Sequence, residues 1–142
     1  MTFKTFTTAL ITSTVLATSA IAGGNTANVV QNGWLNGVAG GQAGDFNHLE
    51  LHQLGFGNDI FATQDGSNNV TAIGQAGAGN GAVSTQTGAM NLNAIAQIGN
   101  NNSAEMHTDG ALNSSTIIQL GDGNSASTSS TGVGNSNTII QW

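Results

Sequence analysis

The fold of this chain is determined by eleven residues, Asn47-His48-Leu49-Glu50-Leu51-His52-Gln53-Leu54-Gly55-Phe56-Gly57. Asparagine occupies the first place, leucine the third and fifth, glutamine the seventh and glycine the ninth. Side chains two residues apart point to the same side of a β-strand, so the asparagine, both leucines and the glutamine share one face. The glycine permits the positive φ that a turn requires. These residues therefore predict a seven-residue strand followed by a four-residue turn.

The same pattern recurs every eleven residues from residue 25 to the end of the sequence. Asparagine begins each unit, and glutamine takes the seventh place except in two units, where Thr108 and Ser130 replace it. A fixed period of this length indicates a solenoid in which each unit is one structural repeat. The repeating amides are Asn25, Gln31, Asn36, Gln42, Asn47, Gln53, Asn58, Gln64, Asn69, Gln75, Asn80, Gln86, Asn91, Gln97, Asn102, Asn113, Gln119, Asn124, Asn135 and Gln141. The turn glycines are Gly33, Gly44, Gly55, Gly66, Gly77, Gly88, Gly99, Gly110, Gly121 and Gly132.

Short strands joined by short turns reverse the chain once per unit. Reversal allows either an antiparallel meander or a flattened coil in which every second unit stacks. The coil is favoured because it places identical residues above one another, so that side-chain amides hydrogen-bond along the stack. A buried amide without a partner costs about 1–3 kcal/mol, and a continuous column avoids that cost. The sequence predicts an all-β fold, a two-sheet parallel β-solenoid of eleven short strands in about five and a half 22-residue coils.

The sizes of the inward-facing apolar residues alternate between units. The residue at the fifth place has a bulky side chain in odd-numbered units and a smaller one in even-numbered units. If the two strands of a coil run in opposite directions, this place meets the third place of the next unit, and most pairs combine a large with a small residue. The pairs are Val29–Val38, Leu51–Ile60, Ile73–Ala82, Ile95–Ala104 and Ile117–Ala126. The predicted apolar core is Val29, Val38, Leu49, Leu51, Ile60, Ile73, Ile95, Ala104, Ile117, Ala126 and Ile139.

Residues 1–22 have the features of an export signal peptide. Lys4 supplies a positive charge, two short apolar runs follow, and Ala20-Ile21-Ala22 is a typical cleavage pattern. We expect cleavage between Ala22 and Gly23, which releases residues 23–142 as one extracellular domain. The apolar runs are too short and too interrupted for a permanent membrane helix, so membrane insertion is not expected.

Composition excludes several classes of partner. Lys4 is the only basic residue against seven acidic ones. Nucleic acid is therefore not expected to bind, because no cation is present to displace its counterions. Cysteine is absent, so disulfides do not hold the domain together, and the absence of proline leaves backbone ladders uninterrupted. No cofactor and no enzymatic activity are expected.

The 22-residue unit resembles the curlin repeat, S-x5-Q-x-G-x2-N-x-A-x3-Q. The stretch Gln97-Ile98-Gly99-Asn100-Asn101-Asn102-Ser103-Ala104-Glu105-Met106-His107 fits its Q-x-G-x-x-N-x-A part, as does Gln119-Leu120-Gly121-Asp122-Gly123-Asn124-Ser125-Ala126. The ending Gln141-Trp142 is similar to the glutamine-aromatic ending of curlins. Residues 23–142 thus look like a curlin-repeat β-solenoid. Unlike enteric curlins, the chain has no glycine-rich targeting segment before its first repeat, and tyrosine and arginine are missing.

The resemblance implies a subunit of curli, the extracellular amyloid fibres of biofilm matrix. A nucleating subunit, an outer-membrane secretion pore and periplasmic chaperones would be its partners. We expect a structural subunit at the bacterial cell surface that polymerises with itself by end-to-end strand addition and supports biofilm, adhesion and surface colonisation. A minor nucleating subunit or a surface adhesin of the same family is the alternative.

An ice-binding or metal-binding β-solenoid is a more remote alternative. His48, Glu50 and His52 lie on the outward face of one strand, about 7 Å apart, where adjacent members could share a zinc ion. Their spacing differs from the H-E-x-x-H metalloprotease motif. A calcium-binding solenoid would need a regularly repeated aspartate, which is absent. An ice-binding surface would need outward columns of threonine, but this column is mixed: Asn28, Glu50, Ala72, Ala94, Thr116 and Thr138.

Overall fold

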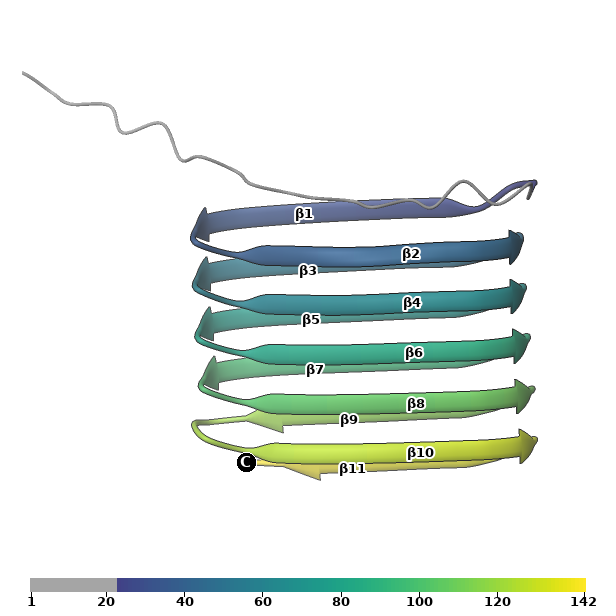
Figure 1. Cartoon of the computed structure of the whole chain (residues 1–142). Coiled ribbons are helices and arrows are strands. Elements are labelled where there is room, and N and C mark those ends of the chain that lie inside the picture. Colours follow the sequence, from purple (N-terminus) through teal and green to yellow (C-terminus); the bar gives the residue numbers. More distant parts are fainter. Residues whose placement is uncertain (1–22) are drawn as a thin grey trace, which may run out of the picture.

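A computed structural model describes residues 23–142, which form eleven β-strands and no helix (Figure 1). The expected signal peptide, residues 1–22, lies outside the described residues. The strands are β1 (Thr26–Trp34), β2 (Gly37–Asp45), β3 (His48–Phe56), β4 (Asp59–Ser67), β5 (Val70–Ala78), β6 (Gly81–Ala89), β7 (Leu92–Asn100), β8 (Ser103–Ala111), β9 (Ser114–Leu120), β10 (Ser125–Val133) and β11 (Ser136–Gln141).

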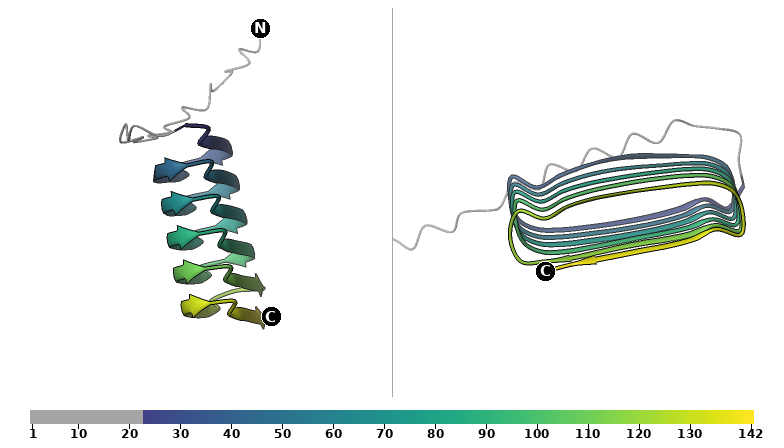
Figure 2. Two further views of the ribbon diagram at one scale, coloured as in Figure 1. Left: turned by 90° about the vertical axis from the view of Figure 1, so that its right-hand side faces the viewer. Right: turned by 90° about the horizontal axis from the view of Figure 1, so that it is seen from below.

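The strands are divided between two parallel sheets. The odd-numbered strands form a six-stranded sheet in the order β1-β3-β5-β7-β9-β11, and the even-numbered strands form a five-stranded sheet. Each strand pairs in parallel with the strand two units later, so that Gln53 lies beside Gln75 and Gly55 beside Gly77. Viewed along the stack, the chain follows a flattened coil with two nearly straight sides (Figure 2). The predicted two-sheet parallel β-solenoid is confirmed, and the antiparallel meander is excluded because consecutive strands lie in different sheets.

The strands are longer and the turns shorter than the sequence pattern predicts. Most strands contain nine residues, such as β5, and run through the repeating glycine. Gly77 has a φ of 128° yet still pairs with its neighbours in the sheet. Only two residues, Gly79 and Asn80, separate β5 from β6. The expectation of a four-residue turn was therefore wrong, because the glycine bends the strand without ending its hydrogen bonding.

One apolar core fills the space between the two sheets. Every residue of the predicted core belongs to it, with Val29 and Ile139 at the ends only partly buried. Ala82, expected as the packing partner of Ile73, also belongs to it, and the structure adds Ala62 and Met106. Each buried isoleucine or leucine contributes about 1.5–3 kcal/mol through removal of its apolar surface from water. The core holds the sheets together and thereby fixes the amide columns at its two margins.

Candidate self-assembly interface

A ladder of glutamine side chains runs without interruption through the six-stranded sheet. At each step Nε2 of one glutamine donates a hydrogen bond to Oε1 of the glutamine 22 residues later, over 2.8–2.9 Å. Nε2 of Gln75 also donates to the main-chain oxygen of Asp59 in the other sheet. The ladder therefore joins successive coils and ties the two sheets together. Its members are Gln31, Gln53, Gln75, Gln97, Gln119 and Gln141.

The corresponding ladder in the five-stranded sheet is shorter. Gln42 donates to Gln64 and Gln64 to Gln86, over 2.8 and 2.9 Å. The column continues with Thr108 and Ser130, which bond across the core instead of along the stack. This ladder is therefore a glutamine ladder only in its first three units.

The repeat pattern does not predict the partners that Thr108 and Ser130 find across the core. Thr108 Oγ1 donates to Asn93 Oδ1 over 2.8 Å, and the hydroxyls of Ser130 and Ser115 are 3.1 Å apart. Asn93 and Ser115 occupy the third place of odd-numbered units, which the pattern assigns to apolar residues. The sequence does contain a sign of these bonds. In both units where another residue replaces glutamine, the residue that faces it across the core is polar: Asn93 faces Thr108, and Ser115 faces Ser130. A buried hydroxyl and its polar partner substitute for one amide of the ladder.

The repeating asparagines bond mainly to the main chain. Asn58 donates its backbone N–H to Asn36 Oδ1 over 3.1 Å and its Nδ2 to the carbonyl of Gly77 over 3.0 Å. A side-chain bond from Nδ2 to Asn36 Oδ1, 3.2 Å long, also joins the two amides. Each interior asparagine thus satisfies backbone groups at the corner between the two sheets. The expected pure amide ladder applies to glutamine more closely than to asparagine.

Close backbone contact explains why glycine recurs at the ninth place. A Cβ on Gly77 would lie 1.8 Å from the carbonyl oxygen of Gly99, and its φ of 128° is in the region that L residues rarely adopt. The carbonyl of Gly77 accepts the bond from Asn58 described above. A side chain at this place would therefore both clash with the next coil and displace an asparagine.

A second set of left-handed residues occupies the eleventh place. Six of these residues are not glycine and have φ between 55° and 58°. Four of the six are large, apolar and exposed, which the sequence pattern did not indicate. Bulky residues are disfavoured in this conformation by about 1–2 kcal/mol. The six residues are Leu35, Phe46, Asn68, Met90, Asn101 and Leu112.

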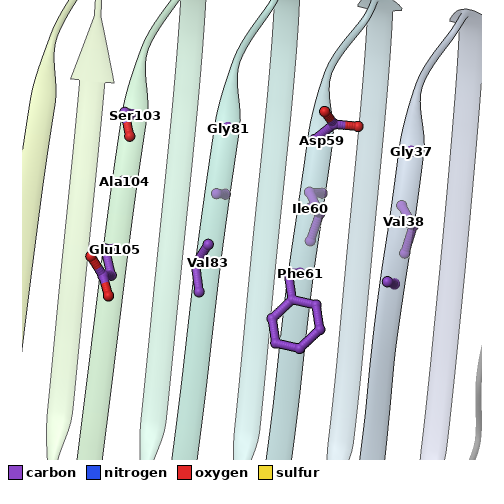
Figure 3. Close-up of a pocket in the computed structure, with 12 residues that line it drawn as sticks. Gly37, Val38, Asp59, Ile60, Phe61, Gly81, Val83, Ser103, Ala104 and Glu105 are labelled. Atoms are coloured by element: carbon purple, nitrogen blue, oxygen red, sulfur yellow. The ribbon is translucent and has the colours of Figure 1, made fainter.

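A shallow groove of about 550 Å³ crosses the outer face of the five-stranded sheet. Phe61, Val83 and Glu105 line one side and Asp59 and Ser103 the other (Figure 3). The groove is open to solvent along its length, and the residues that line it include no histidine, cysteine or lysine.

The histidine and carboxylate triplet on β3 does not form a metal centre. Among residues 23–142, no three His, Cys, Asp or Glu side chains gather into a group that could hold a metal ion. His52 Nε2 lies 3.0 Å from Glu50 Oε1, whereas His48 Nε2 is 3.9 Å from Glu50 Oε2 and His48 Nδ1 bonds to Thr26. All three side chains are about half exposed. The structure therefore does not bring the three side chains together around one point, and the columns beside them in the sheet add no further ligand type.

At both ends of the stack, hydrogen-bonding groups have no partner within residues 23–142. Gln31 Oε1 is buried but has no hydrogen-bond partner within residues 23–142, although every later oxygen of its ladder accepts from the preceding glutamine. Thr128 Oγ1, inside β10, is the other buried side-chain atom of the described residues without a partner. At the opposite end, β10 and β11 are the outermost strands of their sheets. The two ends of the described stack are thus unpaired β-edges.

Comparison with protein-family models, with curated proteins and with solved structures gives no match. The part of the chain that the structure describes contains no helix of the length and apolarity needed to cross a membrane. The fold places the chain in the class of two-sheet parallel β-solenoids with internal amide ladders.

Proposed function

We propose that this chain is a structural subunit of an extracellular, curlin-like amyloid fibre that grows by end-to-end stacking of solenoids. The same proposal includes export of the chain, removal of residues 1–22 and passage through an outer-membrane pore with the help of periplasmic chaperones. It also includes a role of the fibre in biofilm, adhesion and surface colonisation. The signal-like N-terminus and the curlin-like repeats support these features. A parallel, in-register stack with amide ladders has the hydrogen-bonding geometry of a cross-β fibre.

The buried, unpartnered oxygen of Gln31 is the observation that carries the proposal. An orphaned buried acceptor costs about 1–3 kcal/mol, and a donor from a stacked strand would remove that cost. No proline or lysine protects the outermost strands β1, β2, β10 and β11, whereas monomeric β-proteins commonly guard such edges with these residues. Stacking therefore satisfies groups that the single solenoid leaves open.

The winding of the coil defines how a second copy docks. Within residues 23–142 the last strand, β11, lies in the six-stranded sheet, so the next place in the winding is beneath β10. Strand β1 of a second copy fits this place if the copy is rotated by half a turn about the stack axis. Gln31 Oε1 then lies beside the Ser130 hydroxyl, whose hydrogen is free to bond along the stack when Ser115 is the donor of the Ser115–Ser130 pair. The Nε2 of Gln141 meets Oε1 of Gln42 of the second copy. The glutamine ladder of the six-stranded sheet thus continues across the junction into Gln42 of the second copy, and the column that ends in Thr108 and Ser130 resumes as glutamine with Gln31 of that copy.

Growth kinetics of residues 23–142 test this proposal. The purified chain should show a lag, thioflavin fluorescence and a reflection near 4.7–4.8 Å, and preformed fibres should abolish the lag. Gln141→Glu removes the donor at the growing junction and should slow seeded elongation at least tenfold while leaving the β-rich circular dichroism spectrum unchanged. Thr138→Glu, on the outward face of the same strand, is the matched control. A wild-type chain that stays monomeric, or equal elongation by both variants, would overturn the proposal.

A further inference from the structure

The corners of the coil, formed by the tenth and eleventh places of each unit, line up along two edges of the stack. Figure 1 shows the corners that follow odd-numbered strands along one edge and those that follow even-numbered strands along the other. On the first edge, Trp34 and Phe56 hold the tenth place in the first two corners and Asp122 holds it in the last. On the second edge, Asp45 comes first and Val133 last. The two edges therefore change between apolar and acidic in opposite directions.

Six large apolar residues of these corners are open to solvent, with between 52% and 72% of their surface exposed. Leu35 and Leu112 among them have a left-handed backbone, which bulky residues resist and which glycine takes without strain at other corners. Exposed apolar residues held under strain indicate a contact that the single solenoid does not make. The six are Trp34, Leu35 and Phe56 near the start of one edge, and Met90, Leu112 and Val133 near the end of the other.

One backbone hydrogen bond is open at each of these two ends. At the eleventh place, the N–H of each later coil donates to the tenth-place carbonyl of the coil before it, as Leu112 does to Ala89 over 3.1 Å. Within residues 23–142, the N–H of Leu35 has no such acceptor, and the carbonyl of Val133 has no such donor. A donor and an acceptor are thus left open beside the exposed apolar side chains.

We infer that these two ends bind each other in the stack, with the Val133 corner of one copy packed against the Trp34–Leu35 corner of the next. This inference rests on the proposed end-to-end stacking and adds an apolar contact to it. With the half turn, β1 of the second copy lies beneath β10, so Trp34 comes into register with Val133 and the Leu35 N–H meets the Val133 carbonyl. Six successive corners without a polar side chain then form one strip: Ala89-Met90, Ala111-Leu112 and Val133-Gly134 of one copy, followed by Trp34-Leu35, Phe56-Gly57 and Ala78-Gly79 of the next.

Stacking without the half turn would not produce this strip. Trp34 of the second copy would then follow Asp122 on the first edge, and Val133 would be followed by Asp45. Apolar side chains gain by leaving water together, whereas a carboxylate beside them loses part of its hydration. With the half turn, Asp122 and Asp45 instead follow one another on the opposite edge. They stay two coil spacings apart there, about 10 Å, which is about one screening length in 0.1 M salt.

Two cysteine pairs with a shared member test the orientation, since the chain has no cysteine of its own. Val30, Ser129 and Ile140 hold the sixth place of their units and are exposed. Val30 of the second copy lies beside Ser129 with the half turn and beside Ile140 without it, in each case about 4.8 Å away and within disulfide reach. Within one chain both pairs are more than about 20 Å apart. Oxidised fibres of Val30→Cys/Ser129→Cys should therefore give a ladder of linked chains, and those of Val30→Cys/Ile140→Cys should stay monomeric in denaturant.

An aspartate at Val133 tests the apolar contact itself. The tenth place holds aspartate naturally at Asp45 and Asp122, so Val133→Asp should keep the β-rich circular dichroism spectrum. It should slow elongation from wild-type seeds about tenfold in about 0.15 M salt, because a carboxylate replaces the apolar partner of Trp34. Ala89→Asp adds the same charge at the same place two coils from the junction, and it should elongate within about twofold of wild type.

The outcomes separate this contact from the fibre itself. Equal elongation by the two aspartate variants would overturn the apolar contact and leave the strip open to a different partner. Crosslinking of the Ile140 pair in place of the Ser129 pair, or of neither pair, would overturn the half-turn junction while the fibre proposal stands. A wild-type chain that forms no fibres would overturn both.

Discussion

The side-chain amide of Gln75 donates a hydrogen bond to the side-chain oxygen of Gln97, 22 residues later, over 2.8 Å. Both side chains are buried, with 3% and 0% of their surface exposed. Each glutamine is at once an acceptor for the coil above and a donor for the coil below. Stability of the stack therefore depends on every member of the column.

Removal of one amide should break this column. Gln75→Ala leaves Gln97 Oε1 without its donor and opens a cavity, so we expect a loss of about 2–4 kcal/mol in the free energy of unfolding. The fibre-forming lag should lengthen as well. Denaturant titration and thioflavin kinetics measure the two effects. Thr85→Ala, on the outer face, should change neither; a Gln75→Ala chain as stable as this control would contradict the role of the ladder.

Adjacent isoleucines on β9 offer a matched test of the core. Ile117 is fully buried, with 0% exposed, whereas Ile118 points outward. Ile117→Ala should cost about 2–5 kcal/mol because it removes buried apolar contacts and leaves a cavity. Ile118→Ala should leave the stability of the single solenoid within about 0.5 kcal/mol of wild type. Denaturant titration compares the two, and equal losses would show that the inward and outward assignment is incorrect.

Two glycines of β5 should respond in opposite ways to alanine. Gly77→Ala introduces a Cβ 1.8 Å from the Gly99 oxygen and should abolish the folded solenoid. Gly74 has no positive φ and open space around it, so Gly74→Ala should be neutral or stabilise the chain by up to about 1 kcal/mol. Circular dichroism during thermal unfolding distinguishes these outcomes. A folded Gly77→Ala chain would mean that the coils are not in close register at this place.

Relief of backbone strain should stabilise the turns. Leu112 has a φ of 58° and 57% of its surface exposed, so Leu112→Gly should raise stability by about 0.5–1 kcal/mol. The reverse change at an equivalent place, Gly57→Leu, should lower it by a similar amount, because Gly57 has a φ of 64°. Denaturation midpoints test both changes. Destabilisation by Leu112→Gly would show that the leucine side chain makes a contact that outweighs the strain.

Charge repulsion should delay assembly. The whole chain carries a net charge of −6, and without Lys4 residues 23–142 carry −7. Raising ionic strength from about 10 mM to about 100 mM shortens the screening length from about 30 Å to about 10 Å and should shorten the lag. Asp65→Asn should shorten it in low salt and have less effect in high salt. A lag that does not depend on salt would contradict the prediction that repulsion between the acidic residues delays assembly.

The sequence was sufficient to predict which strands pair and in what register. Asparagine, glutamine and glycine each recur at one place, and only parallel stacking of every second unit brings like residues such as Gln75 and Gln97 together. The two-residue alternation predicts which side chains point inward, and the structure places two of them, Leu51 and Ile73, in the core.

Features that depend on neighbouring coils could not be read from single units. The left-handed backbone of Phe46 and Leu112 arises because each turn must match the turns above and below it, although the local preference of these residues opposes it. The bonds from Thr108 and Ser130 depend on which residue faces them across the core. The hollow of about 430 Å³ beside Gly74, on the outer face of the six-stranded sheet, likewise depends on residues from several strands, among them the small Ala76 and Ala96.

The half-turn between consecutive eleven-residue units also governs which changes in length the chain can tolerate. Deletion or duplication of 22 residues, such as residues 70–91, removes or adds a whole coil and leaves all later residues in their original sheet. A change of eleven residues instead moves all later units to the opposite sheet, where Ile95 would join the column of Ala62. The uncharged outer surface of β5, β7, β9 and β11 would then break partway along the molecule. Families built this way should therefore vary in length by whole coils, and gene segments of 66 base pairs should be their natural unit of exchange.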